Sequence, residues 1–320
     1  MQTTTHNEFS KAEENSAPLF KRFFIYQKER FPLLGHGLLV TAFSFSAMSY
    51  SRICRGATGF VETKFFLTGI ATTVTLFLLV RIFDEFKDRE DDARYRRQLP
   101  VPRGLVSLRE LAWLGALTVL FQIVINALFF PKMFLLYALV IAYLCLMGKE
   151  FFVGEWLKKH PFWYVVSHML IIPLVDMYAS GLDWLMAGAE APKGLLFFFA
   201  VSFMNGIVLE IGRKIRTPEN EEFNTYSTMM GAARATRLWL LILFITLGFA
   251  ITACYYAGYG AWGFAILSAI FIVCSIPGWL FLAKENKTRS RFIEYASALW
   301  TIGMYFSLGA IPMLKQLVNA

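Results

Sequence analysis

The sequence predicts an all-α polytopic membrane protein, with about nine transmembrane helices around a central cavity. Its 320 residues are 57% hydrophobic and only 17% charged, a composition typical of membrane proteins. Apolar runs of about 20 residues, the length that crosses hydrocarbon as a helix, follow one another with short connections. They leave no room for a water-soluble core. We therefore expect one membrane domain, residues 33–320, after an N-terminal segment, residues 1–32.

The N-terminal segment divides into two parts. The first 18 residues are polar, and we expect them to be disordered. The next stretch, FKRFFIYQKERFP, mixes basic and aromatic residues as helices at a membrane interface do. We do not expect a signal peptide in it, because no small-residue cleavage site follows an apolar core.

Nine apolar runs predict the transmembrane helices. They cover residues 33–51, 64–83, 108–127, 131–148, 161–179, 193–211, 237–257, 260–283 and 292–314. Two connections, residues 84–107 and 212–236, are longer and more highly charged than a turn requires. Both follow an even-numbered span, so they lie on the same side of the membrane and are expected to face one cavity.

The basic residues predict the orientation. With the N-terminus in the cytoplasm, 25 of the 31 lysines and arginines lie on the cytoplasmic side, and six lie on the other side. We therefore expect an integral protein of the bacterial inner (cytoplasmic) membrane, with the N-terminus and the active site facing the cytoplasm. The net charge of +8 is spread over these connections without base-stacking aromatic motifs, so we expect no nucleic-acid partner.

A dense cluster of charges stands in residues 83–104, FDEFKDREDDARYRRQLPVPRG. If the second helix continues into this stretch, Asp84, Asp88 and Asp92 are spaced i, i+4 and i+8 and fan over about 80° of its surface. Glu85 lies next to them. Clustered carboxylates suit Mg²⁺, which typically bridges protein carboxylates to substrate phosphates. The pattern predicts a metal and diphosphate site; the alternative is a solvated loop with internal ion pairs.

This stretch resembles the first signature of the UbiA-type intramembrane prenyltransferases. That signature is N-D-x-x-D-x-x-x-D at the cytoplasmic end of the second helix, followed by basic residues and R-P-[LV]-P-x-G. Here residues 84–92, DEFKDREDD, have Asp in the place of Asn and Glu in the place of the first Asp. Residues 98–104, QLPVPRG, have Gln in the place of the usual Arg. The resemblance implies a UbiA-like fold, Mg²⁺ as cofactor, and transfer of a prenyl group from an isoprenoid diphosphate to a lipophilic, often aromatic acceptor in the bilayer.

The second signature of the family is D-x-x-x-D near the end of the sixth helix, and the matching stretch is residues 205–231. Glu210 takes the first acidic place, but Lys214 stands four residues later. An ammonium group does not bind a metal, so we expect Lys214 and Arg213 to contact diphosphate oxygens directly. Asn205, about one turn before Glu210, is expected to point into the same cavity. Alternative acids stand further on, at Glu219, Glu221 and Glu222.

The predicted site therefore combines both signatures. The expected metal ligands are Asp84, Glu85, Asp88, Asp92 and Glu210. The expected diphosphate contacts are Arg103, Arg213, Lys214 and Asn205. The expected catalytic residues are Asp88, Asp92, Lys214 and His168. His168 lies inside the fifth span, where polar side chains usually face the protein interior; it is either a buried structural histidine or a contact and base for the acceptor.

Two other functions remain open from the sequence. One is a terpene cyclase of the same fold, in which a double bond of the diphosphate substrate itself captures the cation. The other is a non-enzymatic transporter of cations or anions. Transport needs ionisable residues along a path across the bilayer, and the predicted spans hold few of them.

Overall fold

The computed structural model describes residues 14–217 and 226–318, and within these ranges the secondary structure is helical, as predicted. The first half comprises α2 (Leu19–Arg30), α3 (Leu33–Cys54), α4 (Thr63–Lys87), α5 (Arg89–Tyr95), α6 (Leu108–Phe129), η1 (Pro131–Met133), α7 (Phe134–Gly148), η2 (Glu150–Phe152), α8 (Gly154–Lys159), α9 (Pro161–Met169) and α10 (Ile171–Trp184). The second comprises α11 (Leu195–Arg213), α12 (Tyr226–Met230), α13 (Ala232–Tyr256), α14 (Gly260–Ala283), α15 (Lys287–Tyr305), the π-helical η4 (Phe306–Ala310) and α16 (Ile311–Val318).

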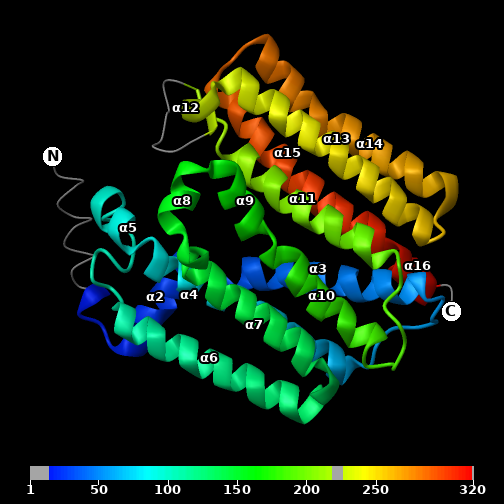
Figure 1. Ribbon diagram of the computed structural model, residues 1–320, viewed down its shortest axis with the longest axis horizontal. Helices are drawn as coiled ribbons and strands as arrows, with labels where there is room; N and C mark the ends of the chain where they lie inside the picture. Colours follow the sequence, from blue (N-terminus) through cyan, green and yellow to red (C-terminus); the bar gives the residue numbers. More distant parts are fainter. Residues whose placement is uncertain (1–13, 218–225, 319–320) are drawn as a thin grey trace.

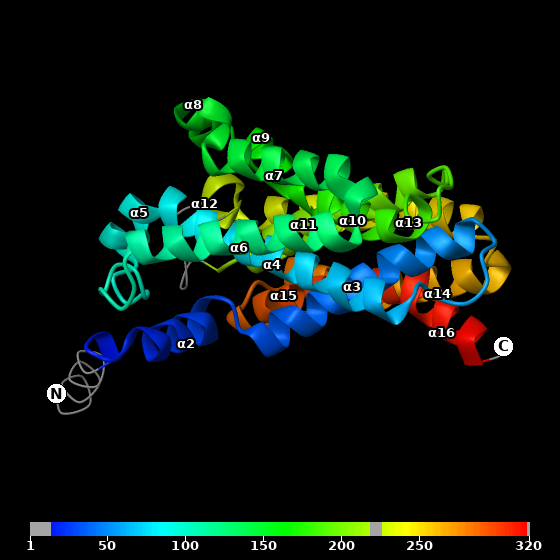
Figure 2. The ribbon, with the colours of Figure 1, turned by 90° about the horizontal axis from the view of Figure 1, so that it is seen from below.

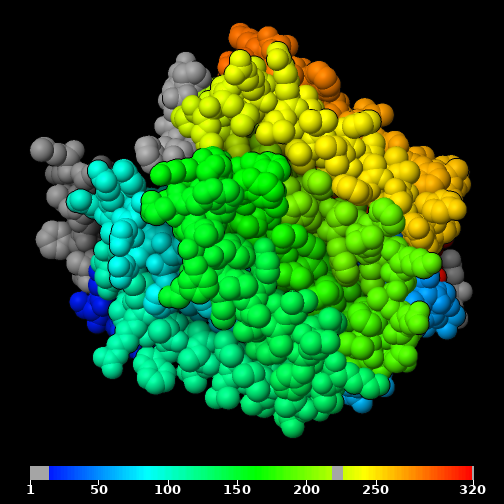
Figure 3. Space-filling model, viewed as in Figure 1, coloured from blue at the N-terminus to red at the C-terminus, as the bar shows by residue number. Residues whose placement is uncertain are grey.

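Nine segments in the described ranges are long and apolar enough to cross a membrane, and each corresponds to a predicted span. They form a bundle in which α11 and α15 lie between the pair α13 and α14 on one side and α3 and α10 on the other (Figure 1). The helices α4, α6 and α7 complete the opposite side. From this direction the segment from α7 to α10 covers the centre of the face, between α6 and α13 (Figure 3).

The faces of α6 show why such helices assemble in lipid. Trp113, Leu117 and Leu120, spaced for one helical face, are exposed. Polar Gln122 and Asn126 are instead fully buried. Gln122 donates to Thr75 on α4 and accepts from Tyr137 on α7, and Asn126 accepts from Tyr178 on α10. Apolar side chains therefore face outward, while interhelical hydrogen bonds hold the interior together.

Several helices continue past the apolar runs that predict them, and their added ends carry charged residues. The fifth span consists of α9 and α10 and continues to Trp184 rather than ending near residue 179. Near its end, Asp183 binds Arg52 at 3.0 Å and Arg55 at 2.6 Å, both at the end of α3. Because the charge is paired, the helix continues past its apolar part. The second span likewise continues from residue 83 to Lys87, and this extension carries Asp84 and Glu85, the first two acids of the acidic motif, residues 84–92.

The predicted interfacial segment forms α2. The exposed side chains of Phe20 and Phe24 lie on its surface, while Tyr26 is 1% exposed. α2 lies at the end of the bundle that also carries α5 (Figures 1 and 2). The α5–α6 connection then leads into a capping box, in which Ser107 and Glu110 bind each other's backbone N–H and start α6.

Candidate active site

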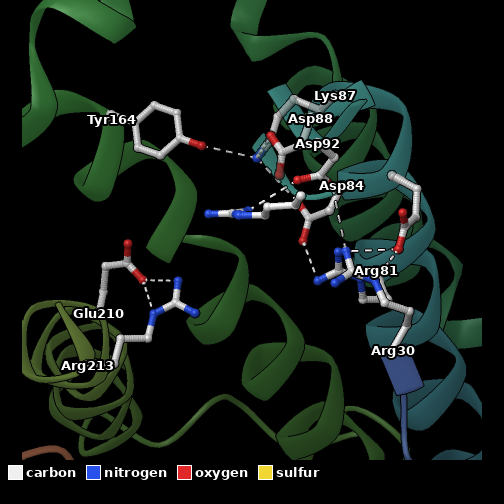
Figure 4. Close-up of polar contacts among 11 residues, drawn as sticks. Arg30, Arg81, Asp84, Lys87, Asp88, Asp92, Tyr164, Glu210 and Arg213 are labelled. Atoms are coloured by element: carbon white, nitrogen blue, oxygen red, sulfur yellow. Dashed lines mark hydrogen bonds and ion pairs between the residues drawn. The ribbon is translucent and has the colours of Figure 1, made fainter. Parts of the chain in front are cut away.

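The acidic motif lies where α4 ends and α5 begins. Asp84 belongs to α4, Asp92 belongs to α5, and Asp88 stands between the two helices. The backbone N–H of Asp88 donates to the Asp84 carbonyl at 2.8 Å, and that of Asp92 donates to the Asp88 carbonyl at 2.8 Å. The four-residue spacing therefore continues through the junction. The three carboxylates gather at the end of α4 (Figure 4).

Asp84 and Asp88 form the more open part of the motif. Their side chains are 27% and 36% exposed. The Lys87 ammonium lies 3.3 Å from Asp84 and 3.9 Å from Asp88, and it donates to the Tyr164 hydroxyl at 3.1 Å. Burial raises the pKa of Asp88 above its ordinary value, although the charge of Lys87 opposes this effect. A lysine thus supplies positive charge between two carboxylates.

Glu85 and Asp92 form the closed part of the motif. The Glu85 side chain is 1% exposed and binds Arg30 at 2.6 Å and Arg81 at 3.4 Å. The Asp92 side chain is 3% exposed and lies 3.2 Å from Arg96 and 3.9 Å from Arg30. Guanidinium groups therefore engage both carboxylates. The contacts of Glu85 in particular are those of a buried ion pair rather than of an open metal ligand.

The second signature faces the first from α11. Glu210 is buried and pairs with Arg213 and with Lys214, whose ammonium lies 2.6 Å from the carboxylate. Glu210 and Arg213 lie across from Asp84 and Asp88 (Figure 4). The structure therefore brings the residues of the two signatures to the same end of the bundle. The further acids at 219, 221 and 222 lie outside the described residues.

Arg103 does not join this group. Its guanidinium binds Glu29 at 2.7 and 2.8 Å and Glu14 at 3.4 Å, and it donates to the Gln98 carbonyl at 3.0 Å. Its side chain is 9% exposed. The guanidinium N–H groups of Arg103 are thus used mainly by acids of the N-terminal segment. In the structure Arg103 therefore holds the N-terminal segment, and its predicted contact with the diphosphate stays a prediction.

Two predicted residues lie deeper in the bundle with unused hydrogen-bonding capacity. His168 Nδ1 lies 2.8 Å from the Tyr164 carbonyl, and the two rings stack with centroids 4.0 Å apart. Because a carbonyl only accepts, Nδ1 carries the proton and the neutral ring keeps a lone pair on Nε2. Within the described ranges, neither this Nε2 nor the side-chain amide of buried Asn205 has a hydrogen-bond partner.

The oxygen donors of the motif suit Mg²⁺, although they form no complete metal cage. Among the described residues, no three His, Cys, Asp or Glu side chains are grouped as a metal site. Mg²⁺ is usually held by one or two carboxylates together with substrate phosphates. Asp84 and Asp88 fit that arrangement, and the ammonium of Lys87 between them marks where positive charge is favourable.

Among the residues at this site that the sequence did not predict are Arg30, Lys87 and Tyr164. Lys87 stands inside the motif spacer, where its charge was visible in the sequence. Tyr164 precedes His168 by one helical turn, a spacing that was also visible. Arg30 is 55 residues from the carboxylate that it binds, and no local pattern links the two.

A model of the UbiA prenyltransferase family matches residues 38–303, which is most of the chain. The chain belongs to the UbiA prenyltransferase family. It is therefore an integral membrane protein of a family that transfers prenyl groups within membranes, from a prenyl diphosphate to a lipophilic acceptor. No curated protein matches the chain.

Solved structures support the UbiA fold. The chain is similar to a digeranylgeranylglyceryl phosphate synthase, with a TM-score of 0.62 and 14% identity over 91% of this chain and 99% of that one. It is also similar to a UbiA homolog from Aeropyrum pernix K1, with a TM-score of 0.63 and 17% identity over 86% of this chain and 97% of that one. Identities this low establish the shared fold alone.

Proposed function

We propose that this protein transfers a prenyl group from an isoprenoid diphosphate to a lipophilic acceptor in the membrane, with Mg²⁺ as cofactor. The observation that carries the proposal is the pair Asp84 and Asp88, which is part-exposed and faces Glu210 and Arg213 across one end of the bundle. Lys214 is paired with Glu210 on the same side. Carboxylates for a metal and fixed cations for phosphate oxygens are the two requirements of a diphosphate leaving group.

The residues at this end have two roles, metal binding and phosphate binding. Asp84 and Asp88 hold the metal, which when bound draws negative charge onto the departing diphosphate. Lys214 and Arg213, both paired with Glu210, would neutralise diphosphate oxygens, as charge-assisted donors do in other phosphoryl sites. Because Lys214 stands where the family has its second acid, we propose one metal and one cationic clamp rather than two metals.

The acceptor binds deeper, beyond Tyr164. In the reaction the bond between the allylic carbon and the diphosphate oxygen breaks, the diphosphate keeps the electron pair, and the acceptor forms a bond to that carbon. His168 Nε2, a lone pair without a partner, takes the proton that the acceptor releases. Many aromatic rings lie buried in the bundle, and their π faces would stabilise an allylic cation.

The distribution of basic residues supports the expected orientation in the membrane. Arg30, Arg81 and Lys87 lie at the end of the bundle that carries the motif. We propose that this end faces the cytoplasm, in the bacterial inner membrane, where the water-soluble diphosphate product is released. Cysteine labelling from either side of closed vesicles tests this placement at residues of α2.

A mass-spectrometric comparison tests the activity. Membranes containing the wild type or Asp88→Ala are supplied with isoprenoid diphosphates of several lengths and Mg²⁺, and lipids that gain a prenyl mass are sought. We expect such a lipid in the wild type alone. Identical lipid profiles for every donor refute the proposal. A cyclic hydrocarbon formed from the donor without any acceptor identifies the protein as a cyclase instead.

A further inference from the structure

The family match begins at residue 38, yet a residue before it reaches into the acidic motif. Arg30, the last residue of α2, binds Glu85 and approaches Asp92. We propose that α2 is part of the active site, and that Arg30 engages these two inner carboxylates so that the metal is confined to Asp84 and Asp88. The inference rests on the proposed function, because it concerns the metal of that reaction.

One face of α2 is built to contact the motif. Arg22, Tyr26 and Arg30 are spaced four residues apart and so share a face. Arg22 binds Glu110 at 2.6 and 3.2 Å and the Leu105 carbonyl at 2.9 Å. Tyr26 is 1% exposed. The three residues place α2 along the stretch that runs from the motif to the start of α6.

A second set of contacts runs in the opposite direction, from the motif loop to the N-terminal segment. Arg103, in the loop after α5, binds Glu29 of α2 and Glu14. Asn15 donates to the Arg103 carbonyl at 2.7 Å. Arginines of α2 thus bind acids of the motif and of α6, while an arginine of the loop binds acids of the N-terminal segment. This reciprocal arrangement fixes α2 on the loop and thereby fixes where the Arg30 guanidinium lies.

The inner carboxylates need this cation because of their burial. Glu85 is 1% exposed, and among the described residues the other cation beside it is Arg81, 3.4 Å away. Arg81 also lies 3.8 Å from Asp84. Without Arg30, Glu85 is a poorly compensated negative charge one residue away from a metal ligand. A divalent cation is then attracted toward Glu85 and Asp92, where it no longer faces the cations of α11.

The geometry also accounts for the glutamate that stands where the family signature has aspartate. Glu85 extends one methylene further than aspartate and meets Arg30 at 2.6 Å. Glu85 thus connects α4 to α2, while its neighbour Asp84 stays part-exposed. Arg30 is a positioning residue, because it acts on the metal through the carboxylates it binds.

Metal binding measured without turnover tests this inference. Mn²⁺ binding to the full-length protein in detergent is followed by electron paramagnetic resonance, with and without inorganic pyrophosphate. Removing a positive charge from beside the carboxylates in Arg30→Ala is expected to tighten Mn²⁺ binding in the absence of pyrophosphate by roughly tenfold. Pyrophosphate-dependent binding is expected to weaken. A purely structural role for α2 predicts lower thermal stability without tighter metal binding.

The matched control is Lys28→Ala, which removes a cation from an exposed position of the same helix. It is expected to bind Mn²⁺ as the wild type does, and Arg30→Lys is expected to return most of the way to the wild type. The double variant Arg30→Ala with Glu85→Gln has no unpaired charge at residue 85, so the fold is not destabilised by a buried charge. The tighter Mn²⁺ binding of Arg30→Ala is expected to disappear in it.

Equal Mn²⁺ affinities in Arg30→Ala and Lys28→Ala overturn the inference. Tight Mn²⁺ binding that persists in the double variant also overturns the inference, because the extra metal is then not bound by Glu85. If the wild type shows no pyrophosphate-dependent binding, the proposed function fails. The comparison of Arg30→Ala with Lys28→Ala for Mn²⁺ alone still decides the role of Arg30.

Discussion

Two clusters of charge lie at opposite ends of the bundle, and they are built differently. At the end of α10, Asp183 has a side chain that is 0% exposed. It accepts from Arg55 at 2.6 and 3.0 Å, from Arg52 at 3.0 Å and from Ser51 at 2.7 Å. At the end of α4, Asp84 has a side chain that is 27% exposed, and its cations lie 3.3 and 3.8 Å away.

The difference separates a structural cluster from the proposed binding site. Each carboxylate oxygen of Asp183 has two short hydrogen bonds from buried or part-buried partners, so nothing is left for a ligand. Asp84 and Asp88 keep exposed oxygens and long contacts that a stronger ligand replaces at little cost. Only the acids of the first signature stand among arginines in the sequence; Asp183 has none nearby, and its partners Arg52 and Arg55 are 131 and 128 residues away. Burial and contact distances distinguish the two clusters.

The largest expected effect is on stability at the closed cluster. Asp183→Ala leaves Arg52 and Arg55 partly buried without their shared carboxylate, and breaking such a pair typically costs about 3–5 kcal/mol. Thermal unfolding in detergent, followed by tryptophan fluorescence, measures the loss. Asp88→Ala serves as the comparison and should unfold like the wild type; equal losses in both variants contradict the distinction.

The next effect is on activity at the open cluster. Asp88→Asn keeps the shape of the side chain but removes its charge, and we expect prenyl transfer to fall by roughly 10²–10³-fold, the size seen when one transition-state contact is lost. Initial rates at saturating donor and Mg²⁺ measure it. The unfolding temperature should not change. A rate near that of the wild type would remove Asp88 from the chemistry.

A smaller effect is expected at the second signature. Lys214→Asp restores the family acid and removes a cation that lies 2.6 Å from Glu210. We expect donor binding to weaken about tenfold, because a charge-assisted contact to phosphate is lost. The dependence of the rate on Mg²⁺ should change from one metal to two. Two-metal dependence already present in the wild type refutes the cationic clamp.

The smallest effect is expected at Arg103. Its partners Glu29 and Glu14 are 39% and 33% exposed, so Arg103→Ala should cost about 1 kcal/mol of stability, the usual size for such pairs. Donor affinity should stay within about threefold of the wild type, a change of less than 1 kcal/mol. A large rise in KM for the donor, with stability unchanged, would show that Arg103 contacts the diphosphate.

Much of the fold follows from the sequence because a membrane span is a local property. About 20 apolar residues suffice to form one, so all nine predicted spans are found within residues 14–217 and 226–318. The predicted ends fail where pairing between helices decides them. The fifth span passes residue 179 because arginines of α3 neutralise Asp183, and local hydropathy carries no information about that pairing.

The candidate site follows from the sequence only in part. The spacing of Asp84, Asp88 and Asp92 places the motif correctly at one helix end. The partners of each acid depend on which helices meet in space. Glu29, which binds Arg103, is 74 residues away from it in the sequence. The same limit explains why the contacts of Arg103 with the N-terminal segment could not be predicted, although Arg103 stands close to the motif in the sequence.

The ion pairs at the motif nearly cancel in charge, which bears on how the donor arrives. The four acids are Asp84, Glu85, Asp88 and Asp92, and the four bases in contact with them are Arg30, Arg81, Lys87 and Arg96. Glu210, Arg213 and Lys214 add one positive charge. The motif itself therefore adds almost no net charge, and the attraction of an anion rests on the cations of α11 and on the other basic residues of the chain, whose net charge is +8. For the proposed diphosphate donor, rising ionic strength should then slow the encounter by screening those basic residues, while the ion pairs of the motif contribute little to this effect.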